Sequence, residues 1–515
     1  MRVRNSMINI ITGIGNQLVI TLLSFISRTV FINSLGIEYL GVNGLFTNIL
    51  TMLTLSEAGI GASIMYSLYK PVADNDRDKI KRLMRLYRNA YMVIALVVTL
   101  LGLSILPFLG TIVKDSGVEH LHAIYLIFLL NTVAPYFFSY KNAYLSVNQK
   151  NYIVTAAFSV NSILSTGLKI GILYFTSNYI LFLIVDSFMT IVTSAVLNRI
   201  ANRKYPYLKE KADGPLDPET KGGIIRNVKA IILQNIGGFL VLETESIIIS
   251  TFVSIAAVGL YSNYKMLIDI ARTLINQVFQ NLYHSVGNLV SSESREKVYR
   301  IYRVMWMVNF WLYSLLSIVL FVVVGPFISA WIGDRYLLPT YVLGLLLLLF
   351  MERGMRNSVS TVKTTAGIFH EDRFVPLGQA AVGLTISIVL VQRIGIAGVF
   401  TGSLIGALAM PFWTTPYLVY TRVFHLPVIR YFRSYLAYLG IGGAALAAAW
   451  FGTQWLPVGG FAGVALKGAL SFVMVNLIYG LCFCKTEEFA YLVQIARGMW
   501  NRIGGRWRPL PNREA

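Results

Sequence analysis

The chain has 515 residues, of which 56% are hydrophobic and only 13% are charged, and its mean hydropathy is +0.63. Soluble domains carry roughly 25% charged residues, so this composition excludes a soluble globular protein. The formal net charge is +20, but no soluble domain carries it, and the sequence gives no indication of nucleic-acid binding.

Fourteen apolar segments follow one another along the chain, and many exceed the ~18 residues that mark a membrane helix. They do not alternate polar and apolar residues as barrel strands do. The first is too long for the apolar core of a signal peptide, so we expect it to be retained as a helix. The sequence therefore predicts an all-α polytopic membrane protein with about fourteen transmembrane helices. The segments span residues 7–32, 40–67, 87–113, 121–147, 152–176, 179–198, 224–252, 257–290, 304–330, 337–361, 374–391, 394–419, 430–451 and 460–484.

The chain contains an internal repeat. Residues 76–85 (DRDKIKRLMR) match residues 294–303 (SREKVYRIYR) at an offset of about 218, and the same offset aligns Gly41 with Gly259. Duplication inside a hydrophobic chain is typical of transporters, whose two halves form a site between them. Each half holds an even number of segments, so both insert with the same orientation, related by an axis along the membrane normal.

We therefore expect two six-helix lobes in a parallel pseudo-two-fold repeat, followed by two further helices. A polar stretch rich in charge, Gly and Pro separates the lobes and predicts a linker. The expected divisions are an N-terminal lobe at 1–200, a cytoplasmic linker at 201–223, a C-terminal lobe at 224–422, and two additional helices with a basic tail at 423–515.

Lysines and arginines gather on one side of the predicted membrane. With the N-terminus inside, the inside connections hold basic patches at 70–88, 199–211 and 295–303, and arginines recur through the C-terminal tail. The outside loops hold only Lys114, Arg335 and Arg393. By the positive-inside rule, both termini are cytoplasmic. The outside loops are also short, which weighs against a membrane glycosyltransferase or polymerase.

Four basic side chains at membrane depth are the candidate substrate ligands. Arg28 lies in the first segment, Lys169 in the fifth, and Lys265 and Arg272 in the eighth. Ionisable residues at this depth are costly and usually line a polar cavity. Because guanidinium donates two parallel hydrogen bonds to phosphate, these bases predict a cationic cavity for a phosphate-bearing substrate. Salt bridges that hold helices together are the alternative interpretation.

The eighth segment concentrates three of the charges on one helical face. Lys265, Asp269 and Arg272 are spaced i, i+4 and i+7. Asp269 can pair with either base, which leaves about one positive charge in excess. Together with Arg28, this face places bases in the first helices of both halves.

The acidic residues at membrane depth have two interpretations. They carry a coupling proton or Na⁺, or they neutralise the bases. Glu243 and Glu245 are two residues apart, so at most one faces the cavity squarely. Glu57 lies in LSEAGIG (55–61), whose small residues allow helices to approach closely, so a helix-packing contact competes with a cavity role. The candidate cavity acids are Glu57, Asp186, Glu243, Glu245 and Asp269.

The sequence gives no sign of an enzyme. It lacks a G-x-x-x-x-G-K-[ST] phosphate loop, an H-E-x-x-H motif and a G-x-S-x-G motif. Its five histidines are scattered without ligand spacing, so we predict neither a metal site nor a cofactor.

Several motifs, taken with the six-plus-six-plus-two layout, resemble the oligosaccharide flippase family. They are SRTVF at 27–31, LGIEYLGVNGLF at 35–46, LSEAGIG at 55–61, the basic patch that follows residues 69–71, and VGLYSNY at 258–264. This bacterial family, of O-antigen or teichoic-acid type, belongs to the multidrug/oligosaccharidyl-lipid/polysaccharide (MOP) exporter superfamily. The resemblance covers nearly the whole chain.

The resemblance implies a V-shaped, two-lobe transporter of the bacterial cell membrane that works by alternating access. Its cargo would be an oligosaccharide linked through diphosphate to undecaprenol, and a polysaccharide polymerase would be a possible partner. The family's cationic cavity would map onto Arg28, Lys265 and Arg272. Because the cavity lies within one chain, a monomer is expected. A lipid II flippase and a cation-coupled multidrug exporter of the same superfamily remain alternatives.

Overall fold

The computed structural model describes residues 2–57, 59–113, 117–210, 214–292, 294–368, 371–456 and 459–504, and these contain helices but no strand. The helices up to the middle of the chain are α1 (Arg2–Leu35), α2 (Ile37–Leu53), α3 (Ile60–Ala73), α4 (Arg77–Ile105), α5 (Leu109–Ile112), α6 (Leu121–Val133), α7 (Ser139–Val147), α8 (Asn151–Thr176), α9 (Tyr179–Lys204) and α10 (Pro218–Phe252). The others are α11 (Ile255–Ser292), α12 (Arg295–Ile332), α13 (Thr340–Met355), α14 (Asn357–Thr365), α15 (Val375–Ile394), α16 (Ile396–Ala409), α17 (Pro411–Val419), α18 (Ile429–Gln454), α19 (Gly460–Phe483) and α20 (Glu487–Gly504).

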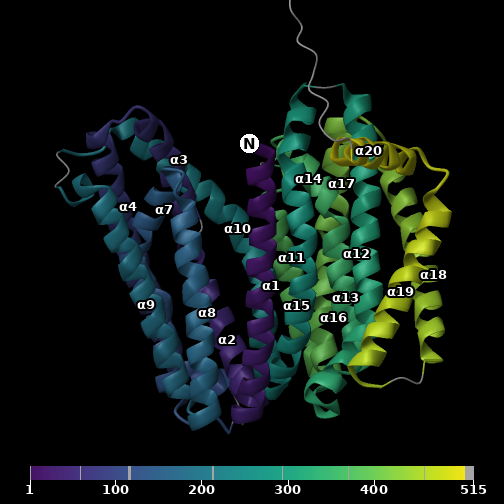
Figure 1. Cartoon of the computed structure of the whole chain (residues 1–515), viewed down its shortest axis with the longest axis horizontal. Helices are drawn as coiled ribbons and strands as arrows, with labels where there is room; N and C mark the ends of the chain where they lie inside the picture. The colour runs from purple at the N-terminus through teal and green to yellow at the C-terminus, as the bar shows by residue number, and fades with distance from the viewer. Residues whose placement is uncertain are drawn as a thin grey trace, which may run out of the picture. The chain divides into compact units, whose positions relative to one another are not determined.

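Each of the fourteen predicted segments is helical, in the predicted order, which confirms the fold class (Figure 1). Within the described residues, eight helices are long and apolar enough to cross a membrane, or nine if the bent pair around α6 and α7 is one span. Helices that begin in a basic patch start several residues before the apolar segment that predicted them. The helix α4, for example, begins at Arg77, where the side chain of Asp76 accepts a hydrogen bond from the Lys79 amide.

Several predicted segments are broken rather than continuous. The second turns through a 3₁₀ helix at Thr54–Glu57, followed by Gly59, whose φ of 155° is readily reached only without a side chain. The fourth breaks at Ala134–Phe137, which includes a proline, and bends by 45° before α7. The tenth breaks between α13 and α14, and the twelfth breaks before Pro411. Such breaks expose backbone groups that a membrane protein tolerates only inside protein or beside a cavity.

The helices form two compact units. The N-terminal unit comprises Met1–Ser262 and Ser387–Val399, and the C-terminal unit comprises Asn263–Ile386 and Phe400–Ala515. The helix α10 belongs to the N-terminal unit because it packs against α2 and α3. The compact units and the halves of the sequence repeat are therefore different divisions of the chain.

Within the N-terminal unit, α2 and the first turns of α11 meet backbone to backbone. A Cβ added to Gly41 would lie less than 3.0 Å from the carbonyl oxygen of Ile255, and one added to Gly259 would lie less than 3.0 Å from that of Ile37. At the repeat offset of 218, Ile255 corresponds to Ile37 and Gly259 corresponds to Gly41. Exchanging equivalent positions of the repeat therefore turns one contact into the other. A local two-fold axis therefore relates these two contacts.

The C-terminal unit is built around α12, which packs against α13, α18 and α19. Its core is aromatic: Trp306 stacks on Tyr431 with ring centroids 4.7 Å apart, and Phe310 is fully buried. The helix α20 runs crosswise to α12 at its upper end in Figure 1. An ion pair between Arg303 and Glu488 and stacking of Phe489 on Trp311 hold its first turn.

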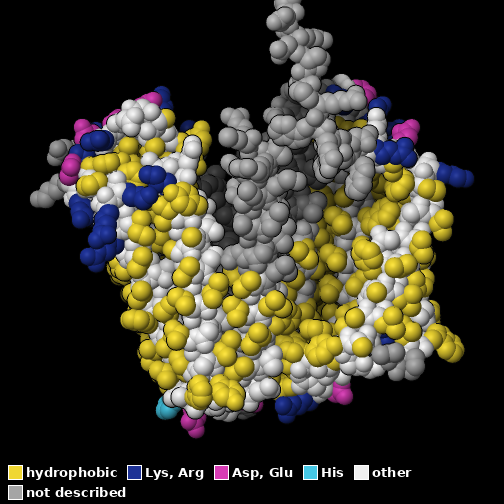
Figure 2. Space-filling model, in the orientation of Figure 1, with side chains coloured by type: hydrophobic (Ala, Val, Ile, Leu, Met, Phe, Trp, Pro, Cys, Tyr) yellow, Lys and Arg dark blue, Asp and Glu magenta, His cyan; other side chains and the backbone are white. Residues whose placement is uncertain are grey.

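Large apolar side chains cover much of the outer surface, as membrane-spanning helices require. On α4, Val93, Leu96 and Leu100 are each about 60% exposed, and on α19, Leu481 is 77% exposed. Figure 2 shows hydrophobic side chains over the middle of each unit. In the N-terminal unit, Lys and Arg gather where α4 begins and α9 ends. In the C-terminal unit they gather near the start of α18 and near α20. Each unit thus has the charge separation that the positive-inside rule describes.

Candidate functional site

Arg28 is held against the start of α11. Its Nη2 donates a hydrogen bond to the Oγ of Ser262 at 2.5 Å, and that hydroxyl in turn donates to the carbonyl of Gly259 at 2.7 Å. The guanidinium of α1 therefore lies beside the glycine contact described above. A charge in this setting needs polar neighbours, because the alternative is hydrocarbon.

The acids of α10 differ in their surroundings. Glu245 is buried, and its Oε2 accepts a hydrogen bond from the hydroxyl of Tyr261 at 2.8 Å. Glu243 lies two residues earlier, on another face of the helix, and is half-buried. Tyr261 and Ser262 are adjacent on α11, so the first turns of this helix join the Arg28 contact from α1 to the Glu245 contact from α10.

Lys169 and Asp186 form a second polar cluster in the N-terminal unit. The Nζ of Lys169 on α8 lies 2.6 Å from the Oδ1 of Asp186 on α9, and the side chains are 18% and 31% exposed. Ser165 donates to the same oxygen at 3.0 Å, and the Asn131 amide donates to Oδ2 at 3.4 Å. The Lys169 ammonium also lies 5.1 Å from the centre of the Phe182 ring. The structure thus places Lys169 in an ion pair, the alternative interpretation of its charge.

Glu57 is bound by tyrosines of α4. The hydroxyl of Tyr91 donates to Glu57 Oε1 at 2.7 Å, and the hydroxyls of Tyr87 and Tyr91 lie 3.4 Å apart. A Cβ on Gly61 would lie 3.1 Å from the Tyr87 hydroxyl oxygen, so this small residue leaves room for the tyrosines. Glu57 therefore joins the 3₁₀ turn between α2 and α3 to α4, which matches the helix-packing interpretation.

The predicted face of α11 lies in the C-terminal unit. Asp269 and Arg272 form an ion pair with Oδ1 and Nη1 2.8 Å apart, and their side chains are 41% and 36% exposed. Lys265, one turn earlier, is half-buried. The face carries two bases and one acid, and charges at the membrane depth that the sequence predicts are costly unless polar groups surround them. The same unit holds a more deeply buried ion pair between Glu352 and Arg356, 2.6 Å apart.

Two amides in the N-terminal unit bridge helices. The Asn43 amide donates to the hydroxyl of Tyr179 at 3.1 Å, and the Asn48 amide donates to that of Ser246 at 2.6 Å. Asn263 differs, because its amide is fully buried and neither of its polar atoms has a hydrogen-bond partner in the described part of the chain. It lies on α11 directly after Ser262.

The sequence predicted the charged members of these clusters but missed several neutral partners. Ser165, Tyr91 and Ser262 complete the contacts of Asp186, Glu57 and Arg28. Of these three, only Ser165 could have been predicted from the sequence. It precedes Lys169 by four residues on one helix and so lies on the same face. In the part of the chain that the structure describes, no three His, Cys, Asp or Glu side chains gather as a metal site would need.

Solved structures that superpose on this chain include membrane transporters. The lipid II flippase MurJ, in an inward closed conformation, superposes with a TM-score of 0.63 at 12% identity, over 92% of this chain and 100% of that one. An inward-facing multidrug resistance MATE family transporter of the MOP superfamily gives 0.58 at 14% identity, over 76% and 91%. A MATE transporter from Vibrio cholerae gives 0.54 at 18% identity, over 78% and 93%.

The chain has the fold of these MOP-superfamily proteins. Neither a protein-family model nor the sequence of a curated protein matches it. The expected all-α, MATE-like fold is confirmed.

Proposed function

We propose that this protein is a flippase that moves an undecaprenyl-diphosphate-linked oligosaccharide from the cytoplasmic to the outer leaflet of the bacterial cell membrane. Both termini would be cytoplasmic, and the transport cycle would alternate access between the two sides. The sequence motifs of the oligosaccharide flippase family and the shared fold support this proposal. The predicted lobes at 1–200 and 224–422 would move relative to each other.

The observation that carries the proposal is the charged face of α11. Lys265, Asp269 and Arg272 hold one more base than acid at membrane depth, and the side chains of Asp269 and Arg272 are more than one third exposed. A diphosphate needs such a face, because its charges cannot enter hydrocarbon unaided. Arg28, in the first repeat, would supply a further base. The polyprenyl tail can stay in lipid, so only the head needs a polar path.

The membrane potential can drive the proposed export. Moving two negative charges outward across an inside-negative potential releases about 4–5 kcal/mol per 100 mV. Glu243 and Glu245 would then neutralise bases, or one of them would carry a coupling proton or Na⁺.

A lipid II flippase is the second candidate. The superposition on MurJ, which spans almost the whole of both chains, favours it. Lipid II also carries an undecaprenyl diphosphate, so the same bases would serve. The cation-coupled multidrug exporter is disfavoured because cationic drugs call for an acidic cavity, and the α11 face has an excess of base.

Translocation in proteoliposomes tests the proposal. Lipid-linked oligosaccharide would be presented to wild type and to Arg28→Ala, Arg272→Ala and Asp269→Asn variants at matched reconstitution. Each arginine variant should lower translocation at limiting substrate by roughly tenfold to a hundredfold, the value of a lost charge-assisted hydrogen bond. Asp269→Asn should retain activity, because it removes a carboxylate that competes with the substrate diphosphate for Arg272.

The matched control is Arg199→Ala, an exposed arginine on α9 of the N-terminal unit. Arginine variants as active as this control would show that the bases are structural charges. Lipid II moved in place of the oligosaccharide would select the second candidate. No movement of any undecaprenyl-diphosphate sugar by wild type, together with efflux of cationic dyes, would refute both and place the protein among drug exporters.

A further inference from the structure

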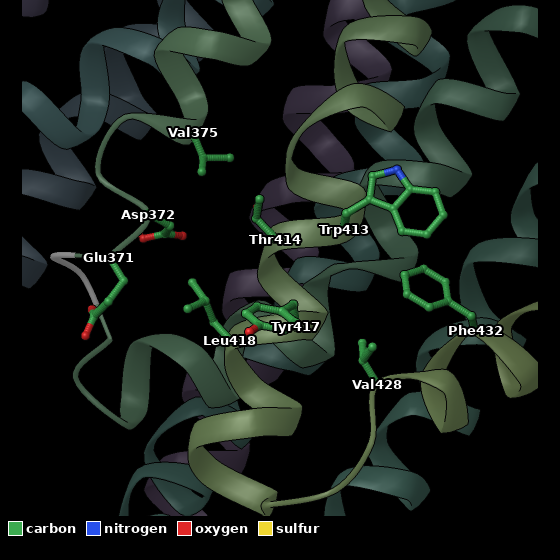
Figure 3. A pocket seen from close by; sticks show the side chains of 9 residues that line it. All are labelled: Glu371, Asp372, Val375, Trp413, Thr414, Tyr417, Leu418, Val428 and Phe432. Carbon is green, nitrogen blue, oxygen red and sulfur yellow. The ribbon is translucent and has the colours of Figure 1, made fainter.

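The C-terminal unit contains a pocket where α17 and α18 meet the turn before α15. Its volume is about 310 Å³, at the lower end of the range for small-molecule sites. Figure 3 shows an apolar wall that includes Trp413 and Phe432 on one side, with the carboxylates of Glu371 and Asp372 on the other. Trp413 and Phe432 also contact each other, with ring centroids 4.6 Å apart.

The two acids of the pocket contribute no net charge to it. Glu371 forms an ion pair with Arg422, which follows α17, and Asp372 forms one with Lys363 of α14. Both carboxylates are therefore neutralised by bases beside them. The rest of the wall is apolar, so the pocket itself favours a hydrocarbon ligand.

Two arginines near the pocket have no acidic partner among the described residues. Arg430 and Arg433 lie in the first turns of α18, next to the wall residues Val428 and Phe432, and both are exposed. Neither forms an ion pair with any residue that the structure describes. The first turns of α18, which include the pocket residue Phe432, therefore carry two exposed positive charges.

The surface around these arginines faces lipid. Trp413 and Tyr417 are 54% and 56% exposed, and Ile429 and Leu436 on α18 are each 67% exposed. Arg433 follows Ile429 by four residues and precedes Leu436 by three, so it shares their helical face. Exposed aromatic residues beside basic ones are typical of the membrane–water interface. The charge distribution assigns this end of the helices to the cytoplasmic side.

We propose that this pocket binds an anionic phospholipid of the cytoplasmic leaflet. Part of an acyl chain lies in the pocket against Trp413 and Phe432, and Arg430 and Arg433 bind the phosphate and acidic headgroup. The site depends on the predicted orientation and on none of the residues assigned to the transported substrate. The pocket contains none of the residues of the charged face of α11. The lipid proposed here is therefore one that stays bound to the protein, and it is distinct from the transported cargo.

Quenching by brominated lipids tests the site. Purified full-length protein would be reconstituted in phosphatidylcholine vesicles in which either the phosphatidylcholine or a minor phosphatidylglycerol component carries bromine on its acyl chains. The signal of Trp413 is the difference between wild type and Trp413→Phe. At equal mole fraction, brominated phosphatidylglycerol should quench this signal several-fold more effectively, since each surface base favours an anionic lipid by about fivefold.

The variant Arg430→Gln/Arg433→Gln should remove that preference. The control Arg335→Gln/Arg393→Gln, which changes two arginines predicted to lie on the outer side, should keep it. Both pairs are at exposed positions, so folding is expected to persist, and equal gel-filtration profiles would check it. Equal quenching of Trp413 by the two lipids, or a preference that survives the Arg430 and Arg433 changes, would overturn the proposal and leave an unselective lipid-facing groove.

Discussion

The Lys169–Asp186 ion pair allows a prediction that separates a structural charge from a substrate ligand. We consider three variants: Lys169→Met, Asp186→Asn, and both together. The pair joins α8 to α9, and both side chains are less than one third exposed. Removing one partner of a buried ion pair costs up to about 3–5 kcal/mol, because the other charge is left in a poor environment.

The two single variants should differ. Without Lys169, the Asp186 carboxylate keeps hydrogen bonds from Ser165 and Asn131, so we expect a loss of about 1–2 kcal/mol of unfolding free energy. Without Asp186, the Lys169 ammonium keeps only the face of Phe182, so we expect about 3 kcal/mol. The double variant should return to within about 1 kcal/mol of wild type.

The assay is equilibrium unfolding of all four forms in detergent micelles, analysed as a double-mutant cycle, with translocation measured on the same samples. A coupling of about 2 kcal/mol or more is expected. Effects that add within about 0.5 kcal/mol would refute the ion pair. If the stable double variant also regains translocation, Lys169 is structural. If it is stable but inactive, Lys169 binds substrate, as the sequence predicts.

Two other predictions concern the backbone. Gly41→Ala and Gly259→Ala should each cost about 1–3 kcal/mol of unfolding free energy, because the new methyl meets a backbone carbonyl that cannot rotate away. The double variant should cost less than the sum, since one separation of α2 from α11 accommodates both methyls; additive costs would contradict the shared contact. At the start of α10, hydrogen bonds from the Thr220 side chain and amide lower the pKa of Asp217 to about 2. This cap is therefore present above about pH 4 and is lost as the pH falls through about 2. Hydrogen exchange of the first turn should rise over that interval, and Asp217→Ala should cost about 0.5–2 kcal/mol at neutral pH, whereas Asp217→Asn should keep the cap at every pH.

Apolarity predicted where the helices lie but not where they end or break. The helix α12 begins at Arg295, ahead of the apolar segment at 304, because its first turns lie outside the apolar region and can be polar. The helix α20 was missed for a related reason: its charged residues hide an amphipathic pattern from a hydropathy average. Gly59, Pro135 and Pro411 mark three of the breaks. No comparable residue stands at the C-cap between α13 and α14, which is Arg356.

In the candidate site, the sequence could predict contacts within one helix but not contacts between helices. The Asp269–Arg272 pair was predictable, because residues three apart on one helix are neighbours. The contact of Arg28 with Ser262 joins residues 234 positions apart. Spacing within one helix cannot predict it, since it depends on how α1 and α11 pack. Polar partners from other helices decide which charges remain available, and one sequence alone does not specify them.

The glycine pair also has a meaning for the origin of the chain. If two copies of the first half assembled as a dimer about the same axis, Gly41 of each copy would meet the other, and a single position in the gene would serve both sides. Fusion of two such copies would turn that position into two, Gly41 and Gly259. Elsewhere the halves were free to acquire different residues, such as Arg28 on α1 and the charged face of α11. At the axis, however, neither half can add a side chain without displacing the other. The same contact therefore constrains both positions to remain glycine.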